Sequence, residues 1–177
     1  MAESSRREAL FAEILGAEGP ALRRAANLYE RDPARAEDLF QEICLALWRG
    51  LPSFRGEATL RTFAFRIAHN RGMSHAARGA RRRQGGASAE IGLAAEVPDP
   101  APTPEAALGL SERAARLRQA MAALPLGLRQ VMTLTLEGLA PAEIGAVLGI
   151  TENNVAVRAN RARERLRAAL GAAGGGR

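Results

Sequence analysis

The sequence has no lysine, a single cysteine and few aromatic residues, which make up 4% of the chain. With Cys44 alone, neither an intrachain disulfide nor a cysteine-rich zinc site is possible, and its setting, EICLALW, predicts ordinary packing inside an amphipathic helix. No apolar run approaches the ~18 residues that a membrane-spanning helix needs. The N-terminal residues MAESSRREALFAEI lack a signal-peptide core. We therefore expect a cytoplasmic protein whose cores consist of Ala, Leu, Ile and Val.

Residue patterns that carry catalysis are also missing. There is no defensible Ser/His/Asp or Cys/His arrangement and no glycine-rich phosphate loop. The two histidines, His69 and His75, are six residues apart, which is poor helical spacing for a shared metal, and no carboxylate or cysteine joins them at ligand spacing. We therefore expect no enzymatic activity, no metal site and no cofactor.

Arginine supplies all 25 basic side chains, against 19 acidic ones, and the formal net charge is +6. Ala, Arg and Gly are abundant together, which indicates a general coding bias, so a single arginine carries little information. The guanidinium group is nevertheless permanently charged, and its planar fork fits phosphates and guanine edges. Clusters of arginine therefore carry more information about function than individual residues do.

The hydrophobic spacing predicts an all-α protein made of two small helical domains joined by a flexible linker. Residues 85–105 are rich in Gly, Ala and Pro and have no sustained period, which is typical of a linker. They separate a first domain, residues 1–84, from a second domain, residues 106–171, and residues 172–177 are expected to form a disordered tail. The predicted helices cover approximately residues 4–15, 20–30, 33–49, 59–78, 110–124, 128–136, 141–148 and 152–170.

The helix predicted over residues 33–49 has two faces. Asp32 can cap it and Pro33 can open it. Its apolar face consists of Ala36, Leu39, Phe40, Ile43 and Leu47, and the opposite face carries Asp38, Gln41, Glu42, Leu45 and Arg49. That opposite face is either solvated or a docking surface for a protein partner. It is not a DNA surface, because phosphates would repel its carboxylates.

A basic segment follows this helix. Pro52 and Gly56 indicate a loop that presents Phe54 and Arg55, and between Arg55 and Arg83 there are eight arginines and one acid. Rings stack on bases, amides bond base edges and guanidinium groups hold phosphates, so this segment predicts a single-stranded nucleic-acid surface. In the alternative interpretation, the aromatic rings belong to the hydrophobic core and the arginines are simply solvated. The expected buried stripe is Leu60, Phe63, Ala64 and Ile67, with Arg61, Phe65, Arg66, His69 and Asn70 on the rest of the helix.

The second domain contains a helix-turn-helix pattern, LAPAEIGAVLGITENNVAVRANRARERL, over residues 139–166. Gly145 is small where two helices would cross closely, Gly149 can adopt the positive φ of a tight turn, and Thr151 can cap the last helix. The apolar residues expected around the turn are Ile144, Leu148 and Ile150. The second helix of such a motif enters the major groove of DNA.

The last helix has an apolar inner stripe and a polar outer side. The inner stripe consists of Val155, Ala159, Ala162 and Leu166. On the outer side, asparagine can bond adenine edges, valine can touch a thymine methyl group, and arginine can hold phosphates. The candidate duplex-binding residues are Asn153, Asn154, Val157, Arg158, Asn160 and Arg161.

Two long stretches of the chain resemble the extracytoplasmic-function (group 4) sigma factors of bacterial RNA polymerase, within the sigma-70 family. In the first domain, the residues AEDLFQEICLALWRGLPSFRGEATLRTFAFRIAHNR resemble region 2 of that family. In the second domain, the residues LPLGLRQVMTLTLEGLAPAEIGAVLGITENNVAVRANRARERLR resemble region 4. The order, the spacing and the short linker also agree, and the resemblance covers nearly the whole chain.

The resemblance implies an alternative sigma factor that directs core polymerase to promoters and promotes DNA opening. In the family, an Asp-Leu-x-Gln-Glu helix docks on the clamp helices of the largest polymerase subunit, which implies core-binding roles for Asp38, Gln41 and Glu42, with Leu45 on the same face. Region 4 binds the −35 duplex and meets the flap of the second-largest subunit. Anti-sigma factors are common partners in the family.

The resemblance also assigns the basic segment. In the family, the loop and the following helix bind and open the −10 element and capture an unstacked base, whose extrusion costs about a few kcal/mol. The candidates implied for −10 binding are Phe54, Arg55, Arg61, Arg66, His69 and Asn70. This chain departs from the usual Trp-Leu-Tyr with Phe63-Ala64-Phe65, and it has Ala156 where the recognition helix commonly carries a basic residue.

Two other classes of function compete with this interpretation. A repressor or activator with a sensor domain would bind duplex operator DNA tightly without polymerase, and it has no need of the face around Gln41. An RNA-binding protein would use the arginine-rich segment, but it leaves the helix-turn-helix without a role.

Overall fold

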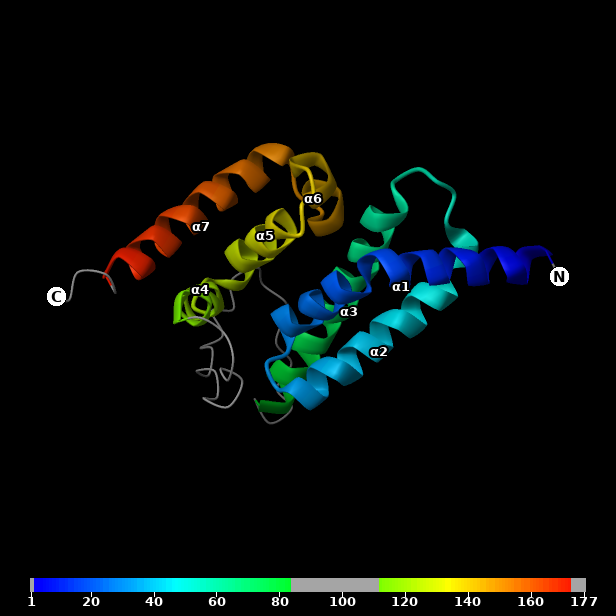
Figure 1. The fold of residues 1–177 in the computed structure, drawn as a ribbon, viewed down its shortest axis with the longest axis horizontal. Helices are drawn as coiled ribbons and strands as arrows, with labels where there is room; N and C mark the ends of the chain where they lie inside the picture. Colours follow the sequence, from blue (N-terminus) through cyan, green and yellow to red (C-terminus); the bar gives the residue numbers. More distant parts are fainter. Residues whose placement is uncertain (1, 84–111, 173–177) are drawn as a thin grey trace.

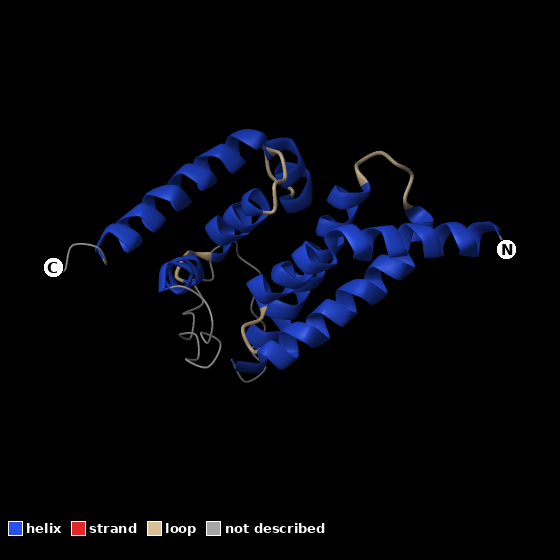
Figure 2. Ribbon diagram, viewed as in Figure 1, coloured by secondary structure: helices blue, strands red, loops and turns tan. Residues whose placement is uncertain are grey.

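The computed structural model describes residues 2–83 and 112–172, and every regular element within them is helical (Figures 1 and 2). The first domain contains α1 (Ala2–Tyr29), α2 (Pro33–Gly50), the short 3-10 helix η1 (Leu51–Ser53) and α3 (Leu60–Arg83). The second domain contains α4 (Glu112–Ala122), α5 (Leu126–Leu136), α6 (Pro141–Leu148) and α7 (Glu152–Ala172). The prediction of an all-α fold is confirmed.

Parts of the predicted domain organisation fall outside this description. The predicted linker, residues 85–105, lies outside the described residues, and so does the predicted tail apart from Ala172, which ends α7. In the part of the chain that is described, no helix is both long and apolar enough to cross a membrane.

A single helix, α1, replaces the two helices that we predicted on either side of Pro20. Proline lacks the N–H group that would bond to the carbonyl of Gly16, and its ring crowds that carbonyl. The space around Gly16 is open, so the turn has room to adjust. Side chains on both sides of the proline, Ile14 and Leu22, are buried in the core. The predicted break was wrong because tertiary packing holds both segments on one axis.

The predictions for α2 are confirmed at its start and along its apolar face. The carboxylate of Asp32 accepts a hydrogen bond from the backbone N–H of Arg35 at 2.9 Å, and Pro33 occupies the first turn. The buried residues of α2 are Ala36, Leu39, Ile43 and Leu47. The next long helix, α3, continues past its predicted end at Arg78 to Arg83.

The helices of the second domain lie where the spacing predicts, but some of their faces differ. The apolar spacing over residues 110–124 and 128–136 predicts buried stripes that include Leu117 and Leu136, but these two side chains are 41% and 65% exposed. Leu134 and Val147, which the predicted stripes omit, are buried instead. On α5 and α6 the difference arises because these helices pack against the first domain as well as within their own, which changes the side of each helix that is covered.

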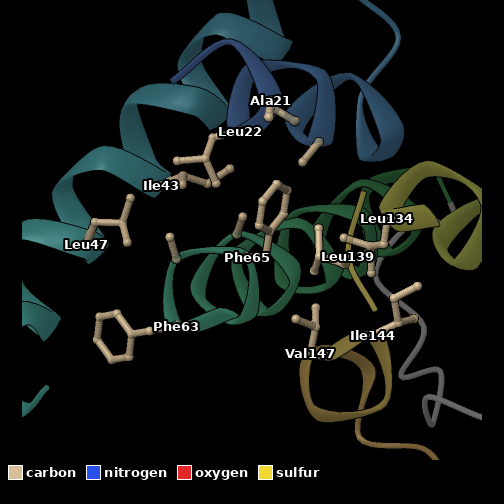
Figure 3. Packing of buried hydrophobic residues seen from close by; sticks show 14 of the residues in the cluster. Ala21, Leu22, Ile43, Leu47, Phe63, Phe65, Leu134, Leu139, Ile144 and Val147 are labelled. Carbon is tan, nitrogen blue, oxygen red and sulfur yellow. The ribbon is translucent and has the colours of Figure 1, made fainter. Parts of the chain in front are cut away.

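The two domains share one hydrophobic core (Figure 3). Phe65 of α3 lies between Leu22 of α1 and Leu139 of the second domain, and its side chain is 1% exposed. We predicted Phe65 outside the buried stripe of its helix, and this was wrong because the second domain covers that face of α3. The residues that the second domain contributes to this core are Val131, Leu134, Leu139, Ile144, Val147, Val155 and Ala159.

Gly72 allows α1 and α3 to cross closely. A Cβ atom at Gly72 would overlap the ring of Tyr29. The Tyr29 hydroxyl is hydrogen-bonded to Nδ1 of His69 at 2.7 Å and accepts a hydrogen bond from Nε2 of Gln130 at 3.3 Å. Burial of this hydroxyl raises the pKa of Tyr29. The ring is therefore held at one end by the backbone of α1 and at the other by the hydrogen bonds of its hydroxyl group, and it has little freedom to move aside.

We expect the substitution Gly72→Ala to lower the free energy of unfolding by about 1–3 kcal/mol, because it overpacks this crossing. Urea unfolding followed by circular dichroism measures the change. The matched control is Gly16→Ala, where the new methyl group meets open space. That control should gain about 1 kcal/mol or less, from the better helix propensity of alanine. A Gly72→Ala protein as stable as the control would contradict the proposed close packing.

Candidate nucleic-acid interfaces and docking face

The predicted docking face of α2 is open to solvent. The side chains of Asp38 and Gln41 are exposed, and Leu45 is 56% exposed. Glu42 is partly exposed and pairs with Arg78 of α3, with 2.9 Å between Nη2 and Oε2. The face therefore combines one apolar side chain with amide and carboxylate groups, and one of its carboxylates is held by a neighbouring helix.

A second acid–base pair ties α3 to the end of α1 beside this face. Nε2 of His75 lies 2.9 Å from Oε2 of Glu30. Burial opposes ionisation of Glu30, but hydrogen bonds from His75 and from the backbone N–H groups of Asp32 and Arg31 together lower the pKa of Glu30. The carboxylates of Asp38 and Glu42 line the same shallow groove as Glu30, His75 and Arg78.

The loop between α2 and α3 presents a cation but keeps its ring against the core. Arg55 is exposed, and Gly56 takes a positive φ of 77° in the loop. The ring of Phe54 is partly buried and packs on Phe63, with 5.1 Å between ring centroids. Phe54 is thus positioned at the edge of the loop rather than projecting freely from it.

The predicted −10 residues on α3 divide into two groups. Arg66 and Asn70 are exposed. Arg61 pairs with Glu18 at 3.2 Å and donates to the backbone carbonyl of Glu137, and only a third of its side chain is exposed. His69 contacts Tyr29, and burial lowers its pKa, which favours the neutral imidazole. In this conformation, the side chains of Arg61 and His69 therefore bond to other residues of the protein.

The helix-turn-helix has the geometry that the sequence predicts. Gly149 adopts φ 67°, and a Cβ atom at Gly145 would lie 2.7 Å from the carbonyl oxygen of Ile150. Thr151 accepts a hydrogen bond through its hydroxyl from the backbone N–H of Asn154 at 3.3 Å. Ile144 is buried, whereas Leu148 and Ile150 are partly buried. Gly149 thus adopts a backbone angle that other residues rarely adopt, and Gly145 leaves no space for a side chain.

The outer side of α7 is open, and its inner stripe is buried as predicted. Val155, Ala159, Ala162 and Leu166 are all buried. Of the candidate duplex-binding residues, Asn153, Asn154, Val157, Asn160 and Arg161 are exposed. Arg158 is half-buried and lies over the first turn of α5, where a Cβ atom at Gly127 would come within 3.1 Å of its Nη1. Arg158 is therefore partly committed to packing within its own domain.

Sequence reasoning missed two features near these surfaces. The hydroxyl groups of Thr59 and Thr62 donate to the carboxylate of Glu143, across the domain boundary. A cavity of about 300 Å³ lies beside Phe54, and Arg6 and Arg7 from α1 line it. No local pattern could indicate either feature, because each joins segments that are far apart in the sequence. Among the residues described, no group of three or more His, Cys, Asp or Glu side chains could hold a metal ion.

Family models match both domains. Residues 14–83 match the model for sigma-70 region 2, and residues 114–166 match the model for sigma-70 region 4. The chain is 32% identical over 167 residues to RNA polymerase sigma factor CnrH of Cupriavidus metallidurans, with 92% of this chain and 87% of that protein covered. It is 33% identical to ECF RNA polymerase sigma factor ShbA of Streptomyces griseus, with 84% and 80% covered.

Solved structures agree. The sigma factor RpoE from Bartonella quintana, in complex with the anti-sigma factor NepR, superposes with a TM-score of 0.71 at 25% identity, over 90% of this chain and 96% of that one. CnrH in complex with the cytosolic domain of CnrY superposes with a TM-score of 0.64 at 26% identity, over 92% and 88%. The chain belongs to the sigma-70 family of bacterial RNA polymerase sigma factors, in the extracytoplasmic-function group, whose members are regulatory proteins that direct transcription initiation at promoters.

Proposed function

We propose that the first domain docks on core RNA polymerase through the exposed face of α2. The docking residues are Asp38, Gln41, Glu42 and Leu45, and their partner is the pair of clamp helices of the largest polymerase subunit. An acidic face with one exposed leucine suits a protein partner, because carboxylates repel DNA phosphates while an apolar side chain gains from burial against protein. The exposure of Asp38, Gln41 and Leu45 together on one face of α2 is the observation that carries the proposal.

The loop and α3 then bind the −10 element and hold it open. Arg66 and Asn70 are exposed on α3 and Arg55 on the loop, so they are placed to reach a strand without rearrangement. Phe54, Arg61 and His69 complete the set. A ring at the edge of the loop can stack on an unpaired base, and guanidinium groups can hold the flanking phosphates.

The second domain binds the −35 duplex through α7 and meets the flap of the second-largest polymerase subunit. Asn154, Val157 and Asn160 are the candidates for base contacts, whereas Arg158 and Arg161 position the helix on phosphates. Asn153 lies at the N-terminal end of the same face. Because Ala156 offers no contact beyond its methyl group, recognition of the duplex depends on few side chains.

In this function the protein is a dissociable specificity subunit and not an enzyme. It works in the cytoplasm, where core polymerase and promoter DNA are found. An anti-sigma factor is a further candidate partner, since two similar sigma factors were solved bound to one or to the cytosolic domain of a partner protein.

Run-off transcription with purified core polymerase over a genomic fragment library tests the whole proposal. We expect discrete transcripts that require both the protein and the core enzyme, and their start points will reveal the promoter elements. A repressor or activator would instead bind duplex fragments tightly without polymerase and would yield no transcripts with core enzyme alone.

The docking face is tested by the double substitution Gln41→Ala with Glu42→Ala. We expect loss of binding to core polymerase in a pull-down or by fluorescence anisotropy, with an unchanged helical circular dichroism spectrum. The matched control is Arg78→Ala, which removes the partner of Glu42 but leaves the docking atoms in place. Undiminished binding by the folded double variant would count decisively against this face.

The opening role of α3 is tested by Asn70→Ala. Loss of a base contact costs about 1–3 kcal/mol, so we expect open-complex formation to fall by about tenfold while binding to the closed duplex is little affected. Permanganate footprinting at the identified promoter measures melting. Ser74→Ala, one turn along on the exposed side of α3, is the matched control. Normal melting by the Asn70→Ala variant would refute the role.

A further inference from the structure

A cavity lies between the start of α1 and the loop that carries Phe54. Its volume of about 300 Å³ is at the lower limit of ligand pockets, which measure about 300–1,000 Å³. All the described residues that line it belong to the first domain. In Figure 1, this end of α1 lies away from the second domain. The cavity therefore has room for one small ligand, and the second domain does not cover it.

The walls of the cavity combine apolar surface with positive charge. Leu10 and Leu51 are apolar, the ring of Phe54 is an aromatic wall, and Arg6 and Arg7 contribute two guanidinium groups. No carboxylate is among the described residues that line it. An aromatic surface beside fixed cations suits single-stranded nucleic acid, because a base packs on the ring while guanidinium groups hold its phosphate.

Arg7 is held in position by the aromatic residues behind it. Its guanidinium carbon lies 4.1 Å from the centre of the Trp48 ring, and Phe11 packs edge to face on the same ring, with 5.3 Å between centroids. Nε of Arg7 is buried and has no hydrogen-bond partner among the described residues. A buried donor without an acceptor is unfavourable, and a phosphate oxygen in the cavity can supply the acceptor after a small rotation of the guanidinium. Arg7 is thus a preorganised cation with an unsatisfied donor.

Arg6 and Ser4 are exposed and line the cavity, so they lie at its opening. The hydroxyl of Ser4 donates to Oε1 of Glu8 at 3.0 Å, one turn along α1. Glu8 itself is exposed and is not among the described residues that line the cavity. The opening therefore presents a mobile guanidinium, that of Arg6, beside the fixed one of Arg7.

The cavity is continuous with the candidate −10 surface. The ring of Phe54 packs on Phe63, and the guanidinium carbon of Arg66 lies 6.0 Å from the centre of the Phe63 ring. Arg66 on α3 and Arg55 on the loop are both exposed. A strand whose base packs on Phe54 can therefore meet arginines from α1 as well as from the loop and α3.

We propose that the first two turns of α1 bind single-stranded DNA, and that Arg6 and Arg7 hold the phosphate of the nucleotide whose base packs on Phe54. Leu10 and Leu51 shield that base from water. A free nucleoside monophosphate has the same chemistry, but the arginines that continue along the loop and α3 favour a strand. The assignment rests on the proposed role of Phe54 in −10 binding and adds α1 to the DNA-binding surface.

Trp48 is the single tryptophan of the chain, and it reports on the cavity because Arg7 lies over its ring. The full chain is titrated with a labelled, mixed-sequence single-stranded oligodeoxynucleotide. Anisotropy of the label measures binding, and emission of Trp48 measures occupation of the cavity. We expect both signals to saturate together. A deoxynucleoside monophosphate should require concentrations at least about tenfold higher, because the strand is also held by other arginines.

Two pairs of variants with matched charge identify the cavity. Arg6→Ala removes a guanidinium from it, and Arg35→Ala removes one from the exposed start of α2. Ser4→Glu places a carboxylate at its opening, whereas Ser5→Glu places one on an exposed neighbour outside the lining. We expect Arg6→Ala and Ser4→Glu to bind the strand about threefold or more weakly than their controls. Arg6→Ala should also lower the slope of log affinity against log salt by about 0.7, the loss of one phosphate contact.

Equal affinities within each pair would overturn the proposal, provided that circular dichroism shows folded variants. Unchanged Trp48 emission while the oligonucleotide binds would place the strand elsewhere and would also overturn it, as would a lack of binding by the wild-type chain. Saturation by the monophosphate at the same concentrations would assign the cavity to a free nucleotide instead. Failure of the proposed function appears separately, as an absence of promoter-dependent transcription with core polymerase, because these titrations need neither promoter nor polymerase.

Discussion

The packing of α3 on two sides is the constraint on which the rest of the structure depends. One side of α3 closes the core of the first domain through Phe63 and Ala64, and the adjoining side receives the second domain around Phe65. The polar positions between and beside these surfaces are the candidates for −10 binding. The packing around α3 therefore determines which of its arginine and amide side chains are exposed to solvent.

Charge is divided among the remaining surfaces in a way that fits distinct partners. The exposed face of α2 carries carboxylates, an amide and Leu45, whereas the open sides of α3 and α7 carry arginine and asparagine. Because the chain has no lysine, each cation is a fixed guanidinium fork, which can be held by a carboxylate as readily as by a phosphate. Acidic residues of the protein and phosphates of DNA can therefore compete for the same arginines.

Local sequence patterns predicted most of the helices but missed the features that depend on contacts between distant segments. Asp32, Gly149 and Thr151 were assigned correctly because each acts through backbone atoms a few residues away. The break at Pro20 was wrong, since burial on both sides of the proline outweighs the lost hydrogen bond. The faces of α5 were misassigned at Leu136 because hydrophobic spacing assumes one neighbour per helix, and α5 has neighbours in both domains.

The sequence by itself determined the helices other than the long α1, the turn of the helix-turn-helix and the acidic face of α2, since these depend on backbone preference and on spacing within one segment. The family resemblance was also contained in the sequence, in two motifs in the right order. Only the tertiary structure decided which of the candidate residues are accessible. The sequence alone does not distinguish Arg61 and His69 from exposed side chains of the same helix. The residues that bond to them, directly or through Tyr29, lie in α1 and at α5, and no local sequence pattern encodes those contacts.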